Sequence, residues 1–224
     1  MARGLFVTGT DTGVGKTRVA VALIHGLRAQ GLRVAAMKPV SAGNASGELN
    51  EDVTALLEAA NVNVDVNDVN PYAFAEPVAP HIAAAQAGVR IELSLIAEAY
   101  SRLAAVADVV VVEGAGGWRV PLNEHEDMAD LARALGLPIV LVVGLRLGCL
   151  SHALLAAESI ANRRLPWAGW VANHIDPAMA HQTENVAALR ARLPGPCLGI
   201  QPFLPPRSLG QTLEWLTLPR ELAS

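Results

Sequence analysis

The amino-acid sequence predicts an α/β fold with a doubly wound, mainly parallel sheet and helices on both of its faces. Short runs rich in β-branched residues alternate along the chain with longer amphipathic stretches, which is typical of right-handed strand–helix–strand units. Residues 109–112 are apolar without interruption, as expected for a parallel strand that is buried on both faces. Hydrophobic residues make up 52% of the 224 residues and charged residues 17%, so there is enough apolar surface for a large core. We expect a single domain over residues 1–224.

The first half of the chain is expected to contain two strands and three helices. A short apolar strand covers residues 4–8 and leads into a glycine-rich turn. Over residues 16–30 apolar side chains recur at helical spacing, and Gly31 follows as a helix stop. A second strand at residues 33–38 ends before Pro39 and is expected beside the first strand in the sheet. The other helices of this half are predicted at residues 52–60 and 91–107.

The second half of the chain alternates more regularly. Its expected strands cover residues 109–112, 139–143, 167–172 and 197–200. Its expected helices cover residues 127–135, 151–162 and 177–193. Two stretches in the first half break the alternation, residues 41–50 and 61–88. In open α/β sheets such loops gather at the carboxyl ends of the strands, where ligands bind.

Charge and cysteine content exclude several classes of protein. Lys and Arg number 17 and Asp and Glu 21, a formal net charge of −4, whereas non-specific nucleic-acid binding needs a basic surface. The two cysteines, Cys149 and Cys197, lie far apart and form neither a redox pair nor a disulfide scaffold, so a reducing cytosol is expected. The apolar runs are too short for a signal peptide or a membrane span. We therefore expect a soluble, cytoplasmic protein that binds neither nucleic acid nor membrane.

The strongest motif is GTDTGVGKT at residues 9–17, which lies between a predicted strand and a predicted helix. Glycines allow the backbone N–H groups to surround one anion, and the helix adds the positive end of its dipole. Lys16 would reach the β- and γ-phosphates of a nucleotide, and the Thr17 hydroxyl would bind Mg²⁺. Thr10 stands where the consensus has its first glycine. The alternative is a glycine-rich turn with an ordinary helix cap, but the strand–helix context favours a phosphate-loop NTPase fold.

Two charged residues at strand ends extend this site. Glu113 ends the run 109–112 and precedes glycines, the position of an acid that holds the metal beside a phosphate loop. Its alternative role is that of a solvated carboxylate at a turn. Lys38 ends the second predicted strand, where it is either a solvated lysine or a second cation of the site.

At this point the sequence resembles the dethiobiotin synthase family. The resemblance runs from about Leu5 to Leu204, and the ordered set of motifs is far more specific than the phosphate loop alone. The matching motifs, in chain order, are GTDTGVGKT at 9–17, KPV at 38–40, NPYAFAEPVAPH at 70–81, EGAGGW at 113–118, GC at 148–149 with His152, and GWVAN at 169–173.

The resemblance implies an ATP- and Mg²⁺-dependent ligase of biotin biosynthesis. Its substrates would be 7,8-diaminononanoate, CO2 and ATP, and its products dethiobiotin, ADP and phosphate. An amine takes up CO2 to form a carbamate, ATP converts this to a mixed carbamic–phosphoric anhydride, and the second amine closes the ring. The resemblance also implies a homodimer with the substrate near the subunit interface.

The resemblance assigns roles to individual residues. Lys38 would act as a catalytic cation beside Lys16, and Mg²⁺ would be held by Thr17, Asp52 and Glu113. Asp52 has the alternative role of a helix-capping acid, and Asn173, which would read adenine, has that of a turn cap. The residues expected to bind nucleotide are Thr12, Gly13, Val14, Gly15, Lys16, Thr17, Asp52, Glu113, Gly114, Ala115, Gly116, Asn173, His174, Pro202, Phe203 and Leu204.

The sequence departs from the family pattern at three positions near the substrate or nucleotide. Ala42 stands where the family commonly has serine, His174 where an acid is common, and Asn185 where a tyrosine often lies. These changes concern substrate affinity more than phosphate chemistry.

Three other classes of protein compete with this assignment. A partner-binding switch ATPase would carry a signature lysine where this chain has Asp11. A cobalamin amidotransferase would need a further glutaminase domain with a nucleophilic cysteine. A pure binding module does not account for Lys16, Lys38, Asp52 and Glu113 at one site.

Overall fold

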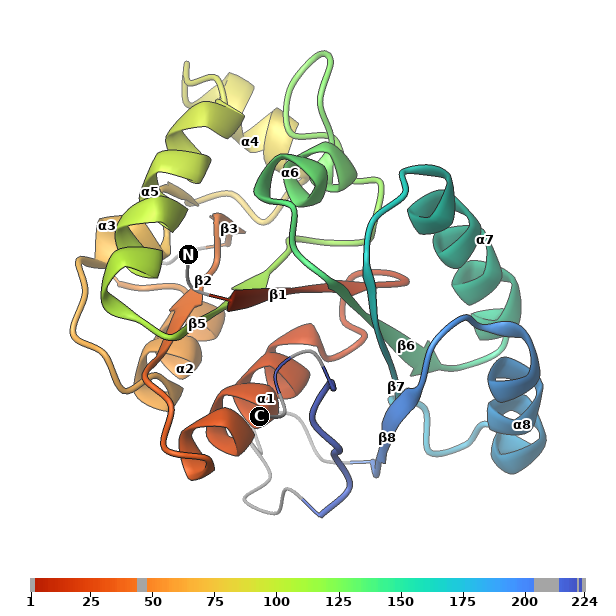
Figure 1. Ribbon diagram of the computed structural model, residues 1–224. Coiled ribbons are helices and arrows are strands. Elements are labelled where there is room, and N and C mark those ends of the chain that lie inside the picture. The colour runs from red at the N-terminus through yellow and green to blue at the C-terminus, as the bar shows by residue number, and fades with distance from the viewer. Residues whose placement is uncertain (1–2, 44–47, 204–213, 221, 223–224) are drawn as a thin grey trace.

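The computed structural model describes residues 3–43, 48–203, 214–220 and 222. Figure 1 shows a central twisted sheet with helices packed on both faces. Within the sheet the strand order is β2-β5-β1-β6-β7-β8, and all neighbours pair in parallel. This confirms the predicted doubly wound α/β fold. The six strands are β1 (Arg3–Gly9), β2 (Val34–Met37), β5 (Val109–Glu113), β6 (Ile139–Leu145), β7 (Trp167–His174) and β8 (Cys197–Gln201).

The sheet separates the buried side chains into two cores, and helices cover the core on each face. On one face lie α1 (Lys16–Ala29) and α2 (Glu51–Ala59), over side chains such as Leu5 and Val111. On the other face lie α5 (Leu93–Val106), α6 (Met128–Leu135) and α7 (Cys149–Asn162), over Phe6 and Val112 (Figure 1). Because neighbouring residues of β1 and β5 point into opposite cores, both strands have uninterrupted apolar runs, at residues 4–7 of β1 and 109–112 of β5. No helix in the described part of the chain is long and apolar enough to cross a membrane.

The predicted position of the second strand was wrong. β2 pairs with β5 and does not touch β1, because β5 is inserted between them with Val109 opposite both Arg3 and Val34. The four valines of β5 are all buried and suit an interior strand, whereas the short β2 forms the edge. Lys38 therefore approaches the phosphate loop across the end of β5.

The two irregular stretches contain short elements that the sequence did not predict. Part of the first stretch forms β3 (Val40–Ala42), which pairs in parallel with β4 (Tyr72–Phe74) in a separate two-stranded sheet. The second stretch also contains α3 (Val66–Val69) and α4 (Pro80–Gln86). Elements of three to seven residues are too short to show a hydrophobic period, which explains why they were missed.

Two helix starts refine the predicted boundaries. α8 (Gln182–Arg192) begins five residues later than expected, because Asp176 and Pro177 form a turn in which Asp176 Oδ1 accepts from the Ala178 N–H. At α2 the N-cap is Asn50, whose side chain accepts from the Asp52 N–H at 3.0 Å. The capping role considered for Asp52 is therefore wrong, and its carboxylate faces elsewhere.

Candidate active site

The phosphate-loop turn, residues 10–15, joins the end of β1 to the start of α1. Gly13 and Gly15 have φ angles of 71° and 89°, in the left-handed region that residues with side chains rarely adopt. Gly15 is the N-cap of α1, and no side chain caps this helix. Its first backbone N–H groups are therefore available to an anion.

Lys16 is the first residue of α1 and is almost entirely buried. Its side chain extends along the turn, and Nζ donates to the Asp11 carbonyl at 3.0 Å. Burial disfavours the ammonium form and the nearby charge of Lys38 opposes it further, so the pKa of Lys16 falls to about 8. A phosphate placed in the loop would supply the negative charge that this lysine lacks.

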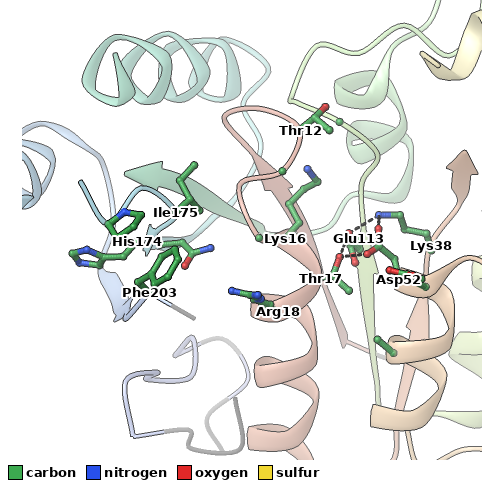
Figure 2. Close-up of a pocket in the computed structure, with 17 residues that line it drawn as sticks. Thr12, Lys16, Thr17, Arg18, Lys38, Asp52, Glu113, His174, Ile175 and Phe203 are labelled. Atoms are coloured by element: carbon green, nitrogen blue, oxygen red, sulfur yellow. Dashed lines mark hydrogen bonds and ion pairs between the residues drawn. The ribbon is translucent and has the colours of Figure 1, made fainter. Parts of the chain in front are cut away.

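Four side chains from separate parts of the fold meet beside Lys16 (Figure 2). Thr17 Oγ1 lies 2.7 Å from Asp52 Oδ1 and 2.9 Å from Glu113 Oε1. Lys38 Nζ donates to Asp52 Oδ2 at 3.0 Å and to Glu113 Oε1 at 2.5 Å. The structure thus brings together the three residues predicted to hold the metal and the second predicted cation.

The charges of this cluster stabilise one another in a buried environment. At Lys38 burial acts against the ammonium, but the carboxylates of Glu113 and Asp52 outweigh it and hold the pKa of Lys38 above its usual value. Burial likewise opposes the charge of Asp52, and Lys38 outweighs it, so the pKa of Asp52 lies below the usual value. Complete burial of Glu113 raises its pKa. Lys38 therefore carries a positive charge at neutral pH.

The oxygen atoms of the cluster fit Mg²⁺. Among the described residues, no group of three or more His, Cys, Asp or Glu side chains could hold a metal. Two carboxylates and the Thr17 hydroxyl form a partial set of hard oxygen ligands, which suits a cation that completes its shell with water and phosphate. In addition, Glu113 Oε2 is buried and has no hydrogen-bond partner, although buried polar atoms are normally paired. A cation would satisfy this atom.

Asn173 lies at the carboxyl end of β7 and contacts the phosphate loop. Its Nδ2 donates to the Val14 carbonyl at 2.8 Å, which fixes the orientation of the amide. Asn173 Oδ1 is buried and has no hydrogen-bond partner. This arrangement presents an acceptor that a ligand can use, and the turn-capping role considered for Asn173 has no support here.

A cavity of about 860 Å³ joins these groups. In Figure 2 the Lys38 cluster lies on one side of the start of α1, and His174, Ile175 and Phe203 lie on the other. Of the residues predicted to bind nucleotide or metal, those that line the cavity are Thr12, Gly13, Gly15, Lys16, Thr17, Lys38, Asp52, Glu113, Gly116, Asn173, His174 and Phe203.

The other predicted residues that the structure describes do not line this cavity. Gly114, Ala115 and Pro202 are not among the lining residues, although each is close in sequence to one that is, Glu113 or Phe203. Val14 is buried, and its carbonyl accepts the hydrogen bond from Asn173 Nδ2. Leu204 lies outside the described residues.

Several lining residues were not predicted from the sequence. They are Arg18, Glu51, Ala55, Ile175 and Pro177. Arg18 and Glu51 directly adjoin predicted residues, so their proximity could have been inferred from helical geometry. Asp11 also has an unpredicted role: its carboxylate accepts from the Thr12 N–H at 2.7 Å and pairs with Arg146 near the start of α7.

Comparisons with known proteins show the family of this chain. The family model described as "AAA domain" matches residues 3–208. The ATP-dependent dethiobiotin synthetase BioD of Nitrosospira multiformis is 55% identical over 203 residues, which cover 91% of this chain and 89% of that protein. The protein of the same name from Aromatoleum aromaticum is 52% identical over 220 residues, which cover 97% of this chain and 98% of that protein.

Solved structures resemble the fold at low sequence identity. The septum site-determining protein MinD of Pyrococcus horikoshii, complexed with Mg-ADP, superposes with a TM-score of 0.57 at 18% identity and covers 92% of this chain and 83% of that chain. The signal recognition particle receptor FtsY of Elizabethkingia anophelis gives 0.54 at 18% identity, covering 99% and 63%. These structural similarities confirm the phosphate-loop NTPase fold. The sequence relatives decide the family: the chain belongs to the ATP-dependent dethiobiotin synthetases, ligases of biotin biosynthesis.

Proposed function

We propose that this enzyme carboxylates 7,8-diaminononanoate with CO2 and closes the ring to dethiobiotin, converting ATP to ADP and phosphate. The observation that carries the proposal is the convergence of Lys16, Lys38 and the Thr17–Asp52–Glu113 set at one wall of a single cavity. Family membership supports the same reaction.

The reaction requires three bond-forming steps. One amine attacks CO2 and loses a proton, which gives a carbamate. A carbamate oxygen attacks the γ-phosphorus of ATP and ADP leaves, which gives a mixed carbamic–phosphoric anhydride. The second amine attacks the carbonyl carbon, loses a proton and expels phosphate as the ring closes. No step needs a nucleophilic protein side chain, so positioning and neutralisation of charge account for catalysis.

The charged residues of the cavity suit these steps. Lys16 would bind the β- and γ-phosphates, and Lys38 would bind the carbamate and the phosphoryl group in transfer, since its Nζ lies at the junction of Asp52 and Glu113. Thr17, Asp52 and Glu113 would hold Mg²⁺. A Mg²⁺ ion held by these residues would neutralise the charge that develops on the phosphate oxygens.

The opposite end of the cavity would hold the adenine base. The unpaired Asn173 Oδ1 would accept from the adenine amino group, and His174 and Phe203 would flank the ring, with Pro202 and Leu204 nearby in sequence. We also propose that the enzyme is a homodimer with the diamine near the subunit interface.

ATP binding is expected to take up a proton at Lys16 in alkaline solution. Because the pKa of Lys16 is about 8 in the free protein, the side chain loses its charge as the pH rises through this value. Phosphate oxygens favour the ammonium, so binding raises the pKa again and ATP affinity falls above pH 8. Calorimetric titration in buffers of different ionisation enthalpy would measure the uptake. Uptake that persists unchanged in Lys16→Gln would contradict the assignment.

Gly15→Ala is expected to weaken ATP binding strongly. The residue has a positive φ, and a Cβ there would lie 2.1 Å from Asn173 Nδ2, so both the loop and the proposed base-binding amide must shift. Gly136→Ala is a matched control, because its φ is +65° and a Cβ there would meet nothing within 4 Å. Both variants should lose about 1–3 kcal/mol of stability through backbone strain, but only Gly15→Ala should lose affinity in equilibrium titration. Equal ATP affinities for the two variants would argue against this role of Gly15.

The proposed function is tested by omitting substrates one at a time. Protein, Mg-ATP, bicarbonate and 7,8-diaminononanoate are mixed, and phosphate and dethiobiotin are followed together. We expect both products in equal amounts and neither without the diamine. Phosphate release that does not depend on the diamine would favour the alternative, a partner-binding switch ATPase. The sequence speaks against that class, because Asp11 stands where such proteins carry a signature lysine.

A further inference from the structure

We infer that Asn70 is a positioning residue for Lys38 and controls the chemical step through the backbone of that lysine. The inference rests on the proposed function of Lys38. Asn70 would act through its hydrogen bond to the Lys38 carbonyl, without contact to the substrate.

Lys38 lies just beyond the last residue of β2, Met37, so the sheet does not pair its backbone. Its N–H donates to the Val69 carbonyl at 2.8 Å. Its own carbonyl accepts from Asn70 Nδ2 at 2.7 Å. The N–H and carbonyl of the buried lysine are thus satisfied by two consecutive residues, Val69 at the end of α3 and its C-cap Asn70, as buried backbone groups require.

Asn70 is itself buried and held in one orientation. Its Nδ2 also donates to the Tyr72 carbonyl at 3.2 Å, and its Oδ1 accepts from the Ser41 hydroxyl at 2.8 Å. Because both donor bonds go to carbonyls, which only accept, reversal of the amide would break both of them. The Asn70 side chain is therefore hydrogen-bonded to Lys38 and Ser41, on either side of Pro39, and to Tyr72 at the start of β4.

These contacts determine where the Lys38 ammonium can lie. Its Nζ must stay between Asp52 and Glu113 while it binds the carbamate and the phosphoryl group. The two carboxylates hold the end of the side chain, and the backbone sets where that side chain starts, so a shift of the backbone would move Nζ relative to the carboxylates. Removal of the Asn70 amide would leave the buried Lys38 carbonyl without its donor, and the chain would shift to recover one.

The test compares Asn70→Ala with wild type in the complete reaction. We expect kcat to fall by about 10- to 100-fold, because misplacing a reacting group by about 1 Å costs up to about 10²-fold in rate. The Kd of ATP should not change, because the side-chain hydrogen bonds of Asn70 go to Lys38, Ser41 and Tyr72, outside the phosphate loop. A general loss of structure would affect both quantities.

Asn61 provides a matched control at the other end of β2. Its Oδ1 accepts from the Val34 N–H at 2.7 Å and its Nδ2 donates to the Leu32 carbonyl at 3.0 Å. Asn61→Ala therefore also removes hydrogen bonds between an asparagine side chain and the backbone, but at the start of β2, whereas Lys38 follows the end of this strand. We expect a loss of thermal stability in both variants and a loss of kcat in Asn70→Ala alone.

If Asn70→Ala does not fold, Asn70→Asp carries the same expectation, since the carboxylate keeps the acceptor for Ser41 but cannot donate to the Lys38 carbonyl. A kcat equal to that of wild type, or a loss shared equally by Asn61→Ala, would overturn the inference. Both variants are compared with wild type under identical conditions. If wild type itself releases no phosphate in the presence of the diamine, the proposed function fails instead, and the two failures are distinguishable.

Discussion

Lys16→Gln is expected to lower the rate of diamine-dependent phosphate release by about 10²- to 10³-fold, the range found when one preorganised donor is removed from an active site. Lys16 belongs to the phosphate-loop motif, and burial together with the nearby charge of Lys38 lowers its pKa to about 8 in the free protein. Glutamine keeps an N–H donor on a side chain that is one atom shorter, but it carries no charge. Both ATP affinity and kcat should therefore fall, which steady-state kinetics and equilibrium titration with ATP would measure.

Arg28→Gln is a matched control for this substitution. Arg28 lies in the last turn of the same helix, where its guanidinium donates to the Ala59 carbonyl away from the cavity. The control removes one positive charge from α1 and should leave kcat and ATP affinity unchanged. If the two variants lose the same activity, a charge at the loop is not what Lys16 supplies.

Lys38→Met is expected to slow the chemical step by about 10²- to 10³-fold while ATP still binds. The phosphate loop and Thr17 remain in place to bind ATP, whereas the contact proposed between Lys38 and the phosphoryl group is needed in the transfer step. The distinguishing measurement is single-turnover phosphate release at saturating ATP, together with the Kd of ATP. Equal losses in both quantities would contradict the assignment of Lys38 to the carbamate and the transferring phosphoryl group.

This substitution also leaves Glu113 buried without its partner. Removal of one member of a buried ion pair costs about 3–5 kcal/mol in typical cases, so the variant must be assayed below its melting temperature. Protonation of Glu113, whose pKa burial already raises, would reduce that cost. The stability of Lys38→Met should therefore decline as the pH rises from acid to neutral, relative to wild type.

The parts of the fold with long, strongly patterned elements were predictable from the sequence. The valines of β5 indicated a strand buried on both faces, and the structure places that strand inside the sheet. The period of α1 and its stop at Gly31 predicted that helix to within one residue at its end. The region of residues 61–88 was not predictable in this way, because β4 forms by pairing with β3 and the helices α3 and α4 are too short to show a hydrophobic period.

The candidate site was predictable to the extent that its residues end strands or follow the phosphate loop. Lys16, Thr17 and Glu113 have such positions, and the structure brings them together. The orientation of Asn173 was not predictable, because it depends on the Val14 carbonyl, 159 residues away in the chain. The bonds of Asn70 to Lys38 likewise join segments whose proximity only the fold reveals.

The most direct test of the central claim follows oxygen from CO2 into phosphate. The account requires that a carbamate oxygen attack the γ-phosphorus and leave with phosphate when the ring closes. With CO2 that carries ¹⁸O at both positions, supplied fresh and quenched before exchange with water, mass spectrometry should find one ¹⁸O in each phosphate and one in each dethiobiotin. Phosphate without ¹⁸O, formed together with labelled dethiobiotin, would contradict the account.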